Sequence, residues 1–263
     1  MSSQVIHRVQ HVYELLQQAE AAKQSITPLS DLYPELSVDE AYQVQLLAIN
    51  EKVGSGERVI GKKIGLTSVA MQQLLGVDQP DYGHLLNSME VSNNGIIHLD
   101  DLFQPKVEGE IAFVLRKDLK GPSVTIEEVL EATEYISPAL EIVDSRITDW
   151  KITLADTIAD NASSGLFVIG DERFSLTDLD LPSIEMNLFK NGVLINTGYG
   201  SDVLGHPAKC VAWLANKLSE YNVVLKAGEV ILSGALSAAV VAEKGDRFTA
   251  GFSHIGKVEV TFK

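Results

Sequence analysis

The sequence is poor in the features that mark secreted, membrane-spanning and nucleic-acid-binding proteins. Its single cysteine, Cys210, cannot form an intrachain disulfide, which fits a reducing compartment. No apolar run approaches the ~18 residues that a transmembrane helix requires. The first residues contain neither a continuous apolar run nor a small-residue cleavage site of the kind that signal peptides carry. We therefore expect a cytoplasmic protein with no membrane partner.

Positive charge is also scarce, because 36 Asp and Glu residues outnumber 21 Lys and Arg residues and leave a net charge of −15. Phosphate backbones and anionic membrane surfaces repel such an acidic chain, so we expect no nucleic-acid partner. A small anionic substrate can still bind where the site is locally cationic. The sequence also lacks the glycine-rich nucleotide-binding motifs, the G-x-S-x-G of serine hydrolases and the H-E-x-x-H zinc motif.

What is present predicts a helical N-terminal part and a β-rich body. A capping box formed by Ser37 and Glu40 opens a helix that closes at Gly54. Beyond this glycine, short β-branched segments cluster between glycine turns instead of alternating with helices, which favours an α+β fold over a doubly wound sheet. We expect a helical N-terminal subdomain at residues 1–55 and a β-rich catalytic body at residues 56–263.

Two further helices are predicted within the body. A second capping box, Thr125 with Glu128, predicts a helix over residues 126–136. Pro207 stands near the first turn of the amphipathic segment "HPAKCVAWLANKLSEY", where proline is well tolerated. In this second helix Cys210 is expected to be a packed thiol rather than a nucleophile.

The segment "KVEGEIAFVL" places two carboxylates on one face of a predicted strand. Because successive strand residues point to opposite faces, Glu108 and Glu110 share a face with Ala112, whereas Val107 and Ile111 face the core. Two like charges this close repel each other and raise each other's pKa unless a cation or a shared proton intervenes. The alternative explanation is a strand end that reaches solvent.

A third acid, Glu141, stands inside the apolar segment "PALEIVDSR", where an unpaired carboxylate is costly. One explanation is a salt bridge to nearby Arg146. If Glu141 instead converges with Glu108 and Glu110, three oxygen ligands leave about half of an octahedral shell open for a chelating 2-oxo acid, and Mg²⁺ or Mn²⁺ is the natural occupant. Zinc is disfavoured, because no His or Cys lies near these acids in the sequence.

Three other segments offer polar groups, each with a simpler structural explanation. Lys62 and Lys63 in "GKKIGLTS" lie on opposite faces of a short strand, so one can point inward while the other is solvated, although two surface lysines are the commoner case. Asp81 in "PDYG" is expected on a loop, as a turn former or as an acid that reaches a site. "TIADNASSG", which contains Asn161 and Ser163, is either a cap and turn or a polar wall against a ligand.

Taken in order, these segments resemble the fumarylacetoacetate hydrolase superfamily, and above all its 2-keto-4-pentenoate (2-hydroxypenta-2,4-dienoate) hydratase branch. The matching blocks run from about Pro28 to the C-terminus and include "GKKIGLTS", "QPDYG", "VEGEIAFVL", "ALEIVDSR", "TIADNASSG", "LGHP", "WLANKL" and "GEVILSGAL". The resemblance implies an α+β fold whose body is a distorted β-barrel or roll. It also implies one divalent metal, Mg²⁺ or Mn²⁺, on Glu108, Glu110 and Glu141.

Further site residues follow from the same resemblance. The family lysine falls on Lys63 rather than Lys62, and the family acid falls on Asp81, so these two residues are the expected catalytic pair. The residues expected to bind substrate are Leu75, Asn161, Ser163 and Ser233.

The hydratase branch implies addition of water to 2-hydroxypenta-2,4-dienoate (2-oxopent-4-enoate), giving 4-hydroxy-2-oxopentanoate, in the meta-cleavage degradation of aromatic compounds. It also implies a homo-oligomer, with a possible complex with a pathway partner enzyme. The alternative is the sister activity, 4-oxalocrotonate (2-oxo-3-hexenedioate) decarboxylase. In that branch an apolar residue tends to stand where this chain has Asp81, although "LSAAVVAEKGD" is closer to the decarboxylases.

Two other classes of function fit the sequence less well. A catalytically idle scaffold or partner subunit has no need of three acids set in apolar strands. A carbon–carbon hydrolase of the wider superfamily needs a histidine–acid pair near the N-terminal part, and His7 and His11 lie in a helix predicted to be exposed.

Overall fold

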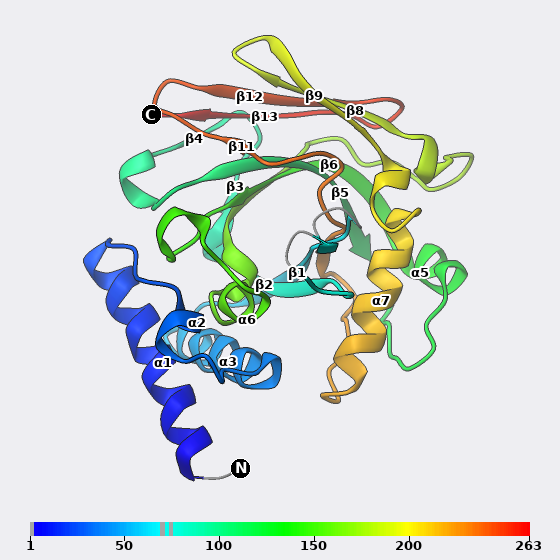
Figure 1. The fold of residues 1–263 in the computed structure, drawn as a ribbon. Coiled ribbons are helices and arrows are strands. Elements are labelled where there is room, and N and C mark those ends of the chain that lie inside the picture. Colours follow the sequence, from blue (N-terminus) through cyan, green and yellow to red (C-terminus); the bar gives the residue numbers. More distant parts are fainter. Residues whose placement is uncertain (1–2, 69–71, 74–75) are drawn as a thin grey trace.

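The computed structural model describes residues 3–68, 72–73 and 76–263. Its largest element is a strongly curled sheet (Figure 1). In spatial order its strands are β2 (Asp81–Leu86), β1 (Val59–Gly65), β10 (Val230–Leu232), β5 (Lys106–Leu115), β6 (Thr133–Val143), β7 (Ser164–Ile169) and β3 (Glu90–Val91), with β11 (Val240–Val241) paired to β5 outside this path. Strand β10 runs parallel to β1 and antiparallel to β5, and therefore joins them.

A second sheet packs on the convex side of the curled sheet, over β6 and β7 (Figure 1). Its strands, in spatial order, are β4 (Gly95–Ile97), β13 (Gly256–Phe262), β12 (Arg247–Phe252), β8 (Glu185–Lys190) and β9 (Val193–Tyr199). The main hydrophobic core includes the facing residues of the two sheets, and Phe248 and Phe262 contribute one edge-to-face aromatic pair to it.

Strand β5 confirms the predicted division of its two faces. Val107, Ile111 and Phe113 belong to the main core on the convex side. On the concave side Ala112 joins a small apolar cluster with Leu85, Ala139, Phe167 and Leu232. The glutamates of β5 therefore open into a concave space that is apolar at one end.

Helices cover the ends and the open side of the curled sheet (Figure 1). They are α1 (Ser3–Ala22), α2 (Leu29–Leu32), α3 (Val38–Gly54), α5 (Ile126–Ala132), α6 (Leu154–Ala159) and α7 (Pro207–Ser219). The capping boxes at Ser37 and Thr125 are present, and the predicted α+β class is confirmed. Cys210 is fully buried in α7, and burial raises the pKa of its thiol to about 12, as expected of a packed thiol. Within the described ranges no helix has the length and apolar character that crossing a bilayer requires.

The helix predicted over residues 126–136 is too long. Helix α5 ends at Ala132, and strand β6 begins at Thr133. The residues after Ala132 include β-branched and aromatic side chains, and pairing with the full length of β5 overrides the helical spacing that continues into them.

Gln45 of α3 joins the N-terminal helices to the wall of the concave space. Its side chain is fully buried, and its amide nitrogen donates to the carbonyl oxygens of Tyr82 (3.0 Å) and Ile158 (2.9 Å). Its amide oxygen lies 3.0 Å from Nδ1 of His84. One side chain therefore ties α3 to both β2 and α6. The expected division between residues 1–55 and 56–263 stays a prediction. The seam formed by the hydrogen bonds of Gln45 crosses this division.

Replacing Gln45 with leucine, which has a similar volume, should lower the free energy of unfolding by about 2–4 kcal/mol, because two buried carbonyls would lose their donor. Urea denaturation measures this loss. The matched control is Gln10→Leu, since Gln10 is exposed and bonds only to Glu14 of its own helix. Equal stability of the two variants would show that the seam does not depend on Gln45.

Candidate functional site

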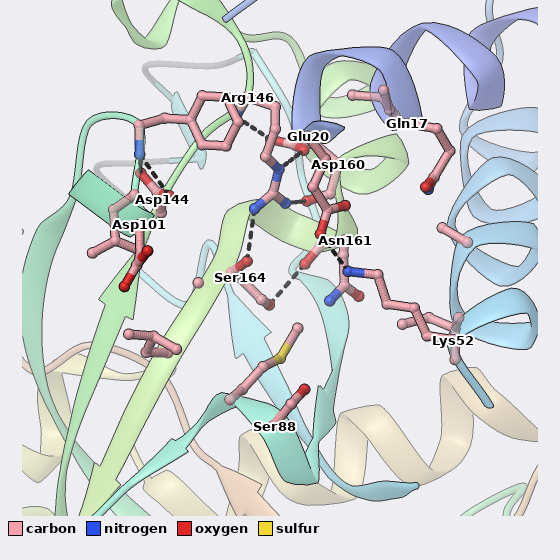
Figure 2. Close-up of a pocket in the computed structure, with 18 of the residues that line it drawn as sticks. Gln17, Glu20, Lys52, Ser88, Asp101, Asp144, Arg146, Asp160, Asn161 and Ser164 are labelled. Carbon is pink, nitrogen blue, oxygen red and sulfur yellow. Dashed lines mark hydrogen bonds and ion pairs between the residues drawn. The ribbon is translucent and has the colours of Figure 1, made fainter. Parts of the chain in front are cut away.

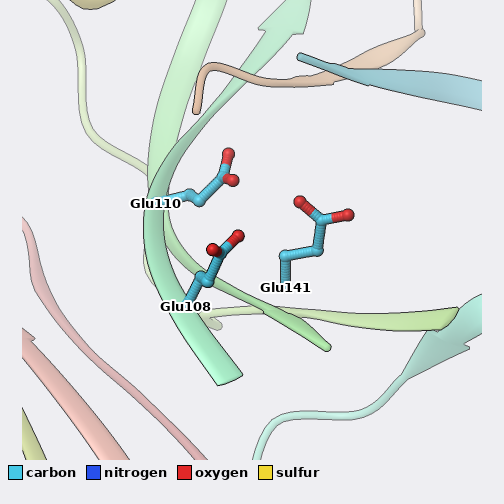
Figure 3. Close-up of side chains that lie close together, drawn as sticks. All are labelled: Glu108, Glu110 and Glu141. Carbon is cyan, nitrogen blue, oxygen red and sulfur yellow. The ribbon is translucent and has the colours of Figure 1, made fainter. Parts of the chain in front are cut away.

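Three glutamates converge on the concave side of the curled sheet. Glu108 and Glu110 project from β5, and Glu141 projects from β6 directly opposite Glu108 in the antiparallel register. Each can place a carboxylate oxygen within 4.8 Å of the other two, and Figure 3 shows the three side chains turned toward one space. Glu110 and Glu141 are each only 1% exposed and Glu108 is half-buried, so a strand end that reaches solvent does not account for the cluster.

The cluster is electrostatically strained without a cation. Burial and the neighbouring Glu141 charge raise the pKa of Glu108 to about 7. Burial, Glu141 and Glu108 together raise the pKa of Glu110 well above its ordinary value, although the backbone N–H of Gly234 donates a 2.7 Å hydrogen bond to its Oε2. Crowded carboxylate oxygens of this kind suit a hard divalent cation.

Lys63, rather than Arg146, is the cationic partner of Glu141. Its Nζ lies 3.1 Å from Oε1 of Glu141, and both side chains are almost completely buried. Burial lowers the pKa of Lys63, but the charges of Glu141 and Asp81 outweigh it and raise the pKa overall. One lysine cannot balance three glutamates, and among the described residues Oε1 of Glu141 has this ion pair but no contact with hydrogen-bond geometry. The donor set therefore fits a bound divalent cation.

Lys62 is also buried, so the expectation that one lysine of the pair is solvated is wrong. Its Nζ lies 3.0 and 3.1 Å from the two carboxylate oxygens of Glu229, which directly precedes β10. The two lysines do point to opposite faces of β1, but both faces are covered at this position. Each lysine therefore has its own acid.

Asp81 is the first residue of β2, not a loop residue as expected, because it pairs in register with Gly65 of β1. A Cβ atom added to Gly65 would lie 2.2 Å from Oδ1 of Asp81 and 3.6 Å from Nζ of Lys63, so this glycine makes room for both side chains. Thr157 of α6 donates a hydrogen bond to the carboxylate, but Oδ1 has no hydrogen-bond partner among the described residues. Burial raises the pKa of Asp81, and Lys63 opposes this increase.

The residues expected to bind substrate have different surroundings. Ser163 is buried, and its hydroxyl lies 3.2 Å from that of Thr157, which also contacts Asp81. The hydroxyl of Ser233 is buried without a hydrogen-bond partner among the described residues. The Asn161 amide is already bonded to the backbone N–H and carbonyl of His84. Leu75 lies outside the described residues.

Two residues that sequence reasoning missed also belong to this region. Thr157 stands beside both Asp81 and Ser163, and only its place in "TIADNASSG" pointed to it. Ser237 has a buried hydroxyl without a hydrogen-bond partner among the described residues, and it follows Leu236, whose N–H bonds to the carbonyl of Gly109 between the two β5 glutamates. Buried hydroxyls without partners are expected where a ligand binds.

Residues Asn161, Ala162 and Ser163 form a left-handed turn. Their φ angles are 54°, 52° and 53°, a conformation that costs about 1–2 kcal/mol for a residue with a Cβ atom. Such a turn persists only when surrounding contacts hold it. The polar segment "TIADNASSG" is therefore a turn, and through Ser163 it also lines the region beside Asp81.

A cavity of about 210 Å³ lies on another side of this turn, between the N-terminal helices and the body (Figure 2). Asn161 and Ser164 contribute to its wall, together with Glu20, Lys52 and Arg146. Neither the three glutamates nor Lys63 and Asp81 line it. The chemistry-bearing cluster and this cavity are therefore separate features.

Comparison with known proteins gives the family. Residues 70–263 match the family model described as "Fumarylacetoacetate (FAA) hydrolase C-terminal". The chain belongs to this family, as the resemblance in its sequence predicted, and the fold expected from that resemblance is confirmed.

Individual proteins that are similar to this chain show which members of the family it resembles. A 2-hydroxyhexa-2,4-dienoate hydratase of Comamonas testosteroni is 49% identical over 255 residues, which cover 96% of this chain and 95% of the relative. A 2-keto-4-pentenoate hydratase of Paraburkholderia xenovorans is 46% identical over 94% of this chain and 92% of the relative. The structure of 4-oxalocrotonate decarboxylase from Pseudomonas putida G7, complexed with magnesium and adipate, superposes with a TM-score of 0.95 at 34% identity and covers 100% of this chain and 99% of that one.

Glu110→Gln keeps the shape of the side chain but removes one of the three charges. We expect Mn²⁺ affinity, measured by calorimetry, to fall by about 100-fold or more, because even mutations outside the ligand shell typically cost 10–100-fold. The melting temperature of the metal-free protein should rise, because one repelling carboxylate is gone.

The matched control is Glu131→Gln on the exposed face of α5, which should change neither quantity. Unchanged Mn²⁺ affinity in Glu110→Gln would rule out Glu110 as a ligand.

Proposed function

We propose that this protein is a divalent-metal-dependent hydratase (a hydro-lyase). It adds water to 2-hydroxypenta-2,4-dienoate and gives 4-hydroxy-2-oxopentanoate in the meta-cleavage degradation of aromatic compounds. The observation that carries the proposal is the buried Asp81 carboxylate, which lies beside Lys63 and the three glutamates and has one oxygen without a hydrogen-bond partner in the part of the chain that the structure describes. The hydratase names of relatives at 46% and 49% identity support it.

Glu108, Glu110 and Glu141 would hold the cation, Mg²⁺ or Mn²⁺. When bound, the cation would supply Lewis-acid stabilisation of negative charge on the substrate's 2-oxygen. The magnesium in the decarboxylase complex supports this choice of ion type. Lys63 offsets part of the charge of Glu141 and leaves the cluster net negative.

The remaining groups handle protons, water and the substrate. In the overall reaction C3 and C5 each gain a proton, C4 gains a hydroxyl group, and the 2-hydroxyl loses its proton as the ketone forms, so that one water molecule is added. Oδ1 of Asp81, to which no residue within 3–68, 72–73 and 76–263 donates a hydrogen bond, can hold a water molecule or exchange a proton, and Thr157 fixes the orientation of the carboxylate. Lys63 offers hydrogen-bond donors at the same place. We also propose that Leu75, Asn161, Ser163 and Ser233 contact the substrate.

The second candidate is decarboxylation of 4-oxalocrotonate, supported by the structural similarity to the decarboxylase. Asp81 disfavours it. An anionic side chain at ~4 Å from the second carboxylate of that substrate would cost on the order of 4 kcal/mol at an effective dielectric of about 20. We further propose a homo-oligomer in the cytoplasm, with a possible complex with a pathway partner enzyme. Light scattering that gives a monomer at micromolar concentration would contradict the oligomer.

Asp81→Asn should lower kcat/KM for 2-hydroxypenta-2,4-dienoate by about 100-fold or more, which is the usual contribution of a general acid or base. It should also weaken the discrimination against 2-oxo-3-hexenedioate, because the repelling charge is gone. Steady-state assays on both substrates with Mg²⁺ measure the two effects.

Asp78→Asn is the control, three residues earlier and exposed. If Asp81 only shapes the start of β2, asparagine should leave both activities unchanged. Equal substrate ratios in wild type and Asp81→Asn, or a wild type that prefers the diacid, would overturn the hydratase proposal.

A further inference from the structure

The left-handed turn Asn161–Ser163 is flanked by two backbone carbonyls, and one buried arginine binds both. Nη2 of Arg146 donates to the carbonyl of Asp160, which precedes the turn, at 2.6 Å. Nη1 donates to the carbonyl of Ser164, which follows it, at 3.0 Å. Figure 2 shows this guanidinium between Asp160 and Ser164.

Arg146 also fixes the side chain of Asp160. Its Nε donates to Oδ1 of that carboxylate, and its backbone N–H donates to Oδ2 at 3.0 Å. The Asp160 side chain is 1% exposed and the Arg146 side chain 16% exposed, so this is a buried ion pair. Among the described residues the side-chain hydrogen bonds and the ion pair of Arg146 go to Asp160 and Ser164, and none goes to the three glutamates.

Contacts on the other side of the turn carry its shape toward the site. The N–H of Ser163 bonds to the carbonyl of Asp160 at 2.9 Å, which is the same carbonyl that Arg146 binds. The hydroxyl of Ser164 donates to the carbonyl of Asn161 at 2.7 Å. The hydroxyl of Ser163 ends 3.2 Å from Thr157. A change in the hydrogen bonds from Arg146 to the two carbonyls would therefore move Ser163.

We propose that Arg146 is a positioning residue of the substrate site: by bridging the carbonyls of Asp160 and Ser164 it holds the left-handed turn that aims Ser163 at the substrate. The inference rests on the proposed function, because it takes Ser163 as a substrate contact. It also explains why this position carries an arginine. A planar guanidinium reaches one carboxylate and two carbonyls at once, whereas the single ammonium group of lysine cannot.

The test compares Arg146→Lys with wild type as full-length, metal-loaded protein. The probe is 2-oxopentanoate, a saturated analogue that cannot be hydrated. We expect its Kd, and the KM for 2-hydroxypenta-2,4-dienoate, to rise about tenfold, which corresponds to one lost hydrogen bond. Mn²⁺ affinity should stay within twofold and kcat should fall less than KM rises, because the metal cluster and Asp81 are untouched.

Arg173→Lys is the matched control. Arg173 is exposed and stacks on Tyr135, 4.6 Å from the ring centroid, so its replacement should leave both affinities unchanged. If circular dichroism shows that Arg146→Lys does not fold, Ser164→Ala takes its place. It removes the bond to the Asn161 carbonyl without unpairing a charge, and it should raise the Kd for 2-oxopentanoate about threefold.

Each outcome bears on a different claim. A folded Arg146→Lys protein, or in its place Ser164→Ala, that binds 2-oxopentanoate as wild type does would overturn the positioning role. So would a loss of Mn²⁺ affinity that accounts for the whole effect. A metal-loaded wild type that does not bind 2-oxopentanoate would overturn the proposed function itself, and the positioning role with it.

Discussion

Repulsion among three crowded carboxylates, two of them buried and one half-buried, is the constraint around which the concave side of the sheet is organised. Glu108, Glu110 and Glu141 can bring their oxygens within 4.8 Å of one another in a region almost closed to water. The protein supplies only partial compensation, namely the Lys63 ammonium and one backbone N–H from Gly234. The balance fits a divalent cation, whose binding then contributes directly to the stability of the folded state.

The walls of the site show the opposite design, in which polar groups are fully paired. The amide nitrogen of Gln45 donates to backbone carbonyls of β2 and α6, and the amide of Asn161 is hydrogen-bonded to the backbone of His84. Such saturated networks give a single arrangement, because any shift leaves a buried group without a partner. Rigid walls around a few deliberately unpaired groups are what a site for a small ligand requires.

Local patterns predicted the parts of the fold and site that depend on local physics. The period of two along β5 placed Glu108 and Glu110 on one face correctly, and the capping boxes located helix starts. Local sequence patterns did not predict which distant segments pair with each other. Asp81 lies in a strand because its segment pairs with β1. Helix α5 ends where it does because the residues after it pair with β5. Arg146 lies near Glu141 in sequence, yet it pairs with Asp160. The position beside Glu141 is occupied by Lys63, which comes from a strand distant in sequence.

The place of β10 between β1 and β5 has a consequence for how the chain acquires its site during synthesis. Lys63 lies on β1 and two of the glutamates lie on β5, and among the described strands β10 alone bridges these two; its residues, Val230–Leu232, follow both strands by more than a hundred residues of sequence. The lysine and the acids therefore cannot be brought into this register until residues 230–232 have been synthesised and have left the ribosome. Before that moment the edges of β1 and β5 are unpaired, and this is the period in which a nascent chain is most exposed to aggregation.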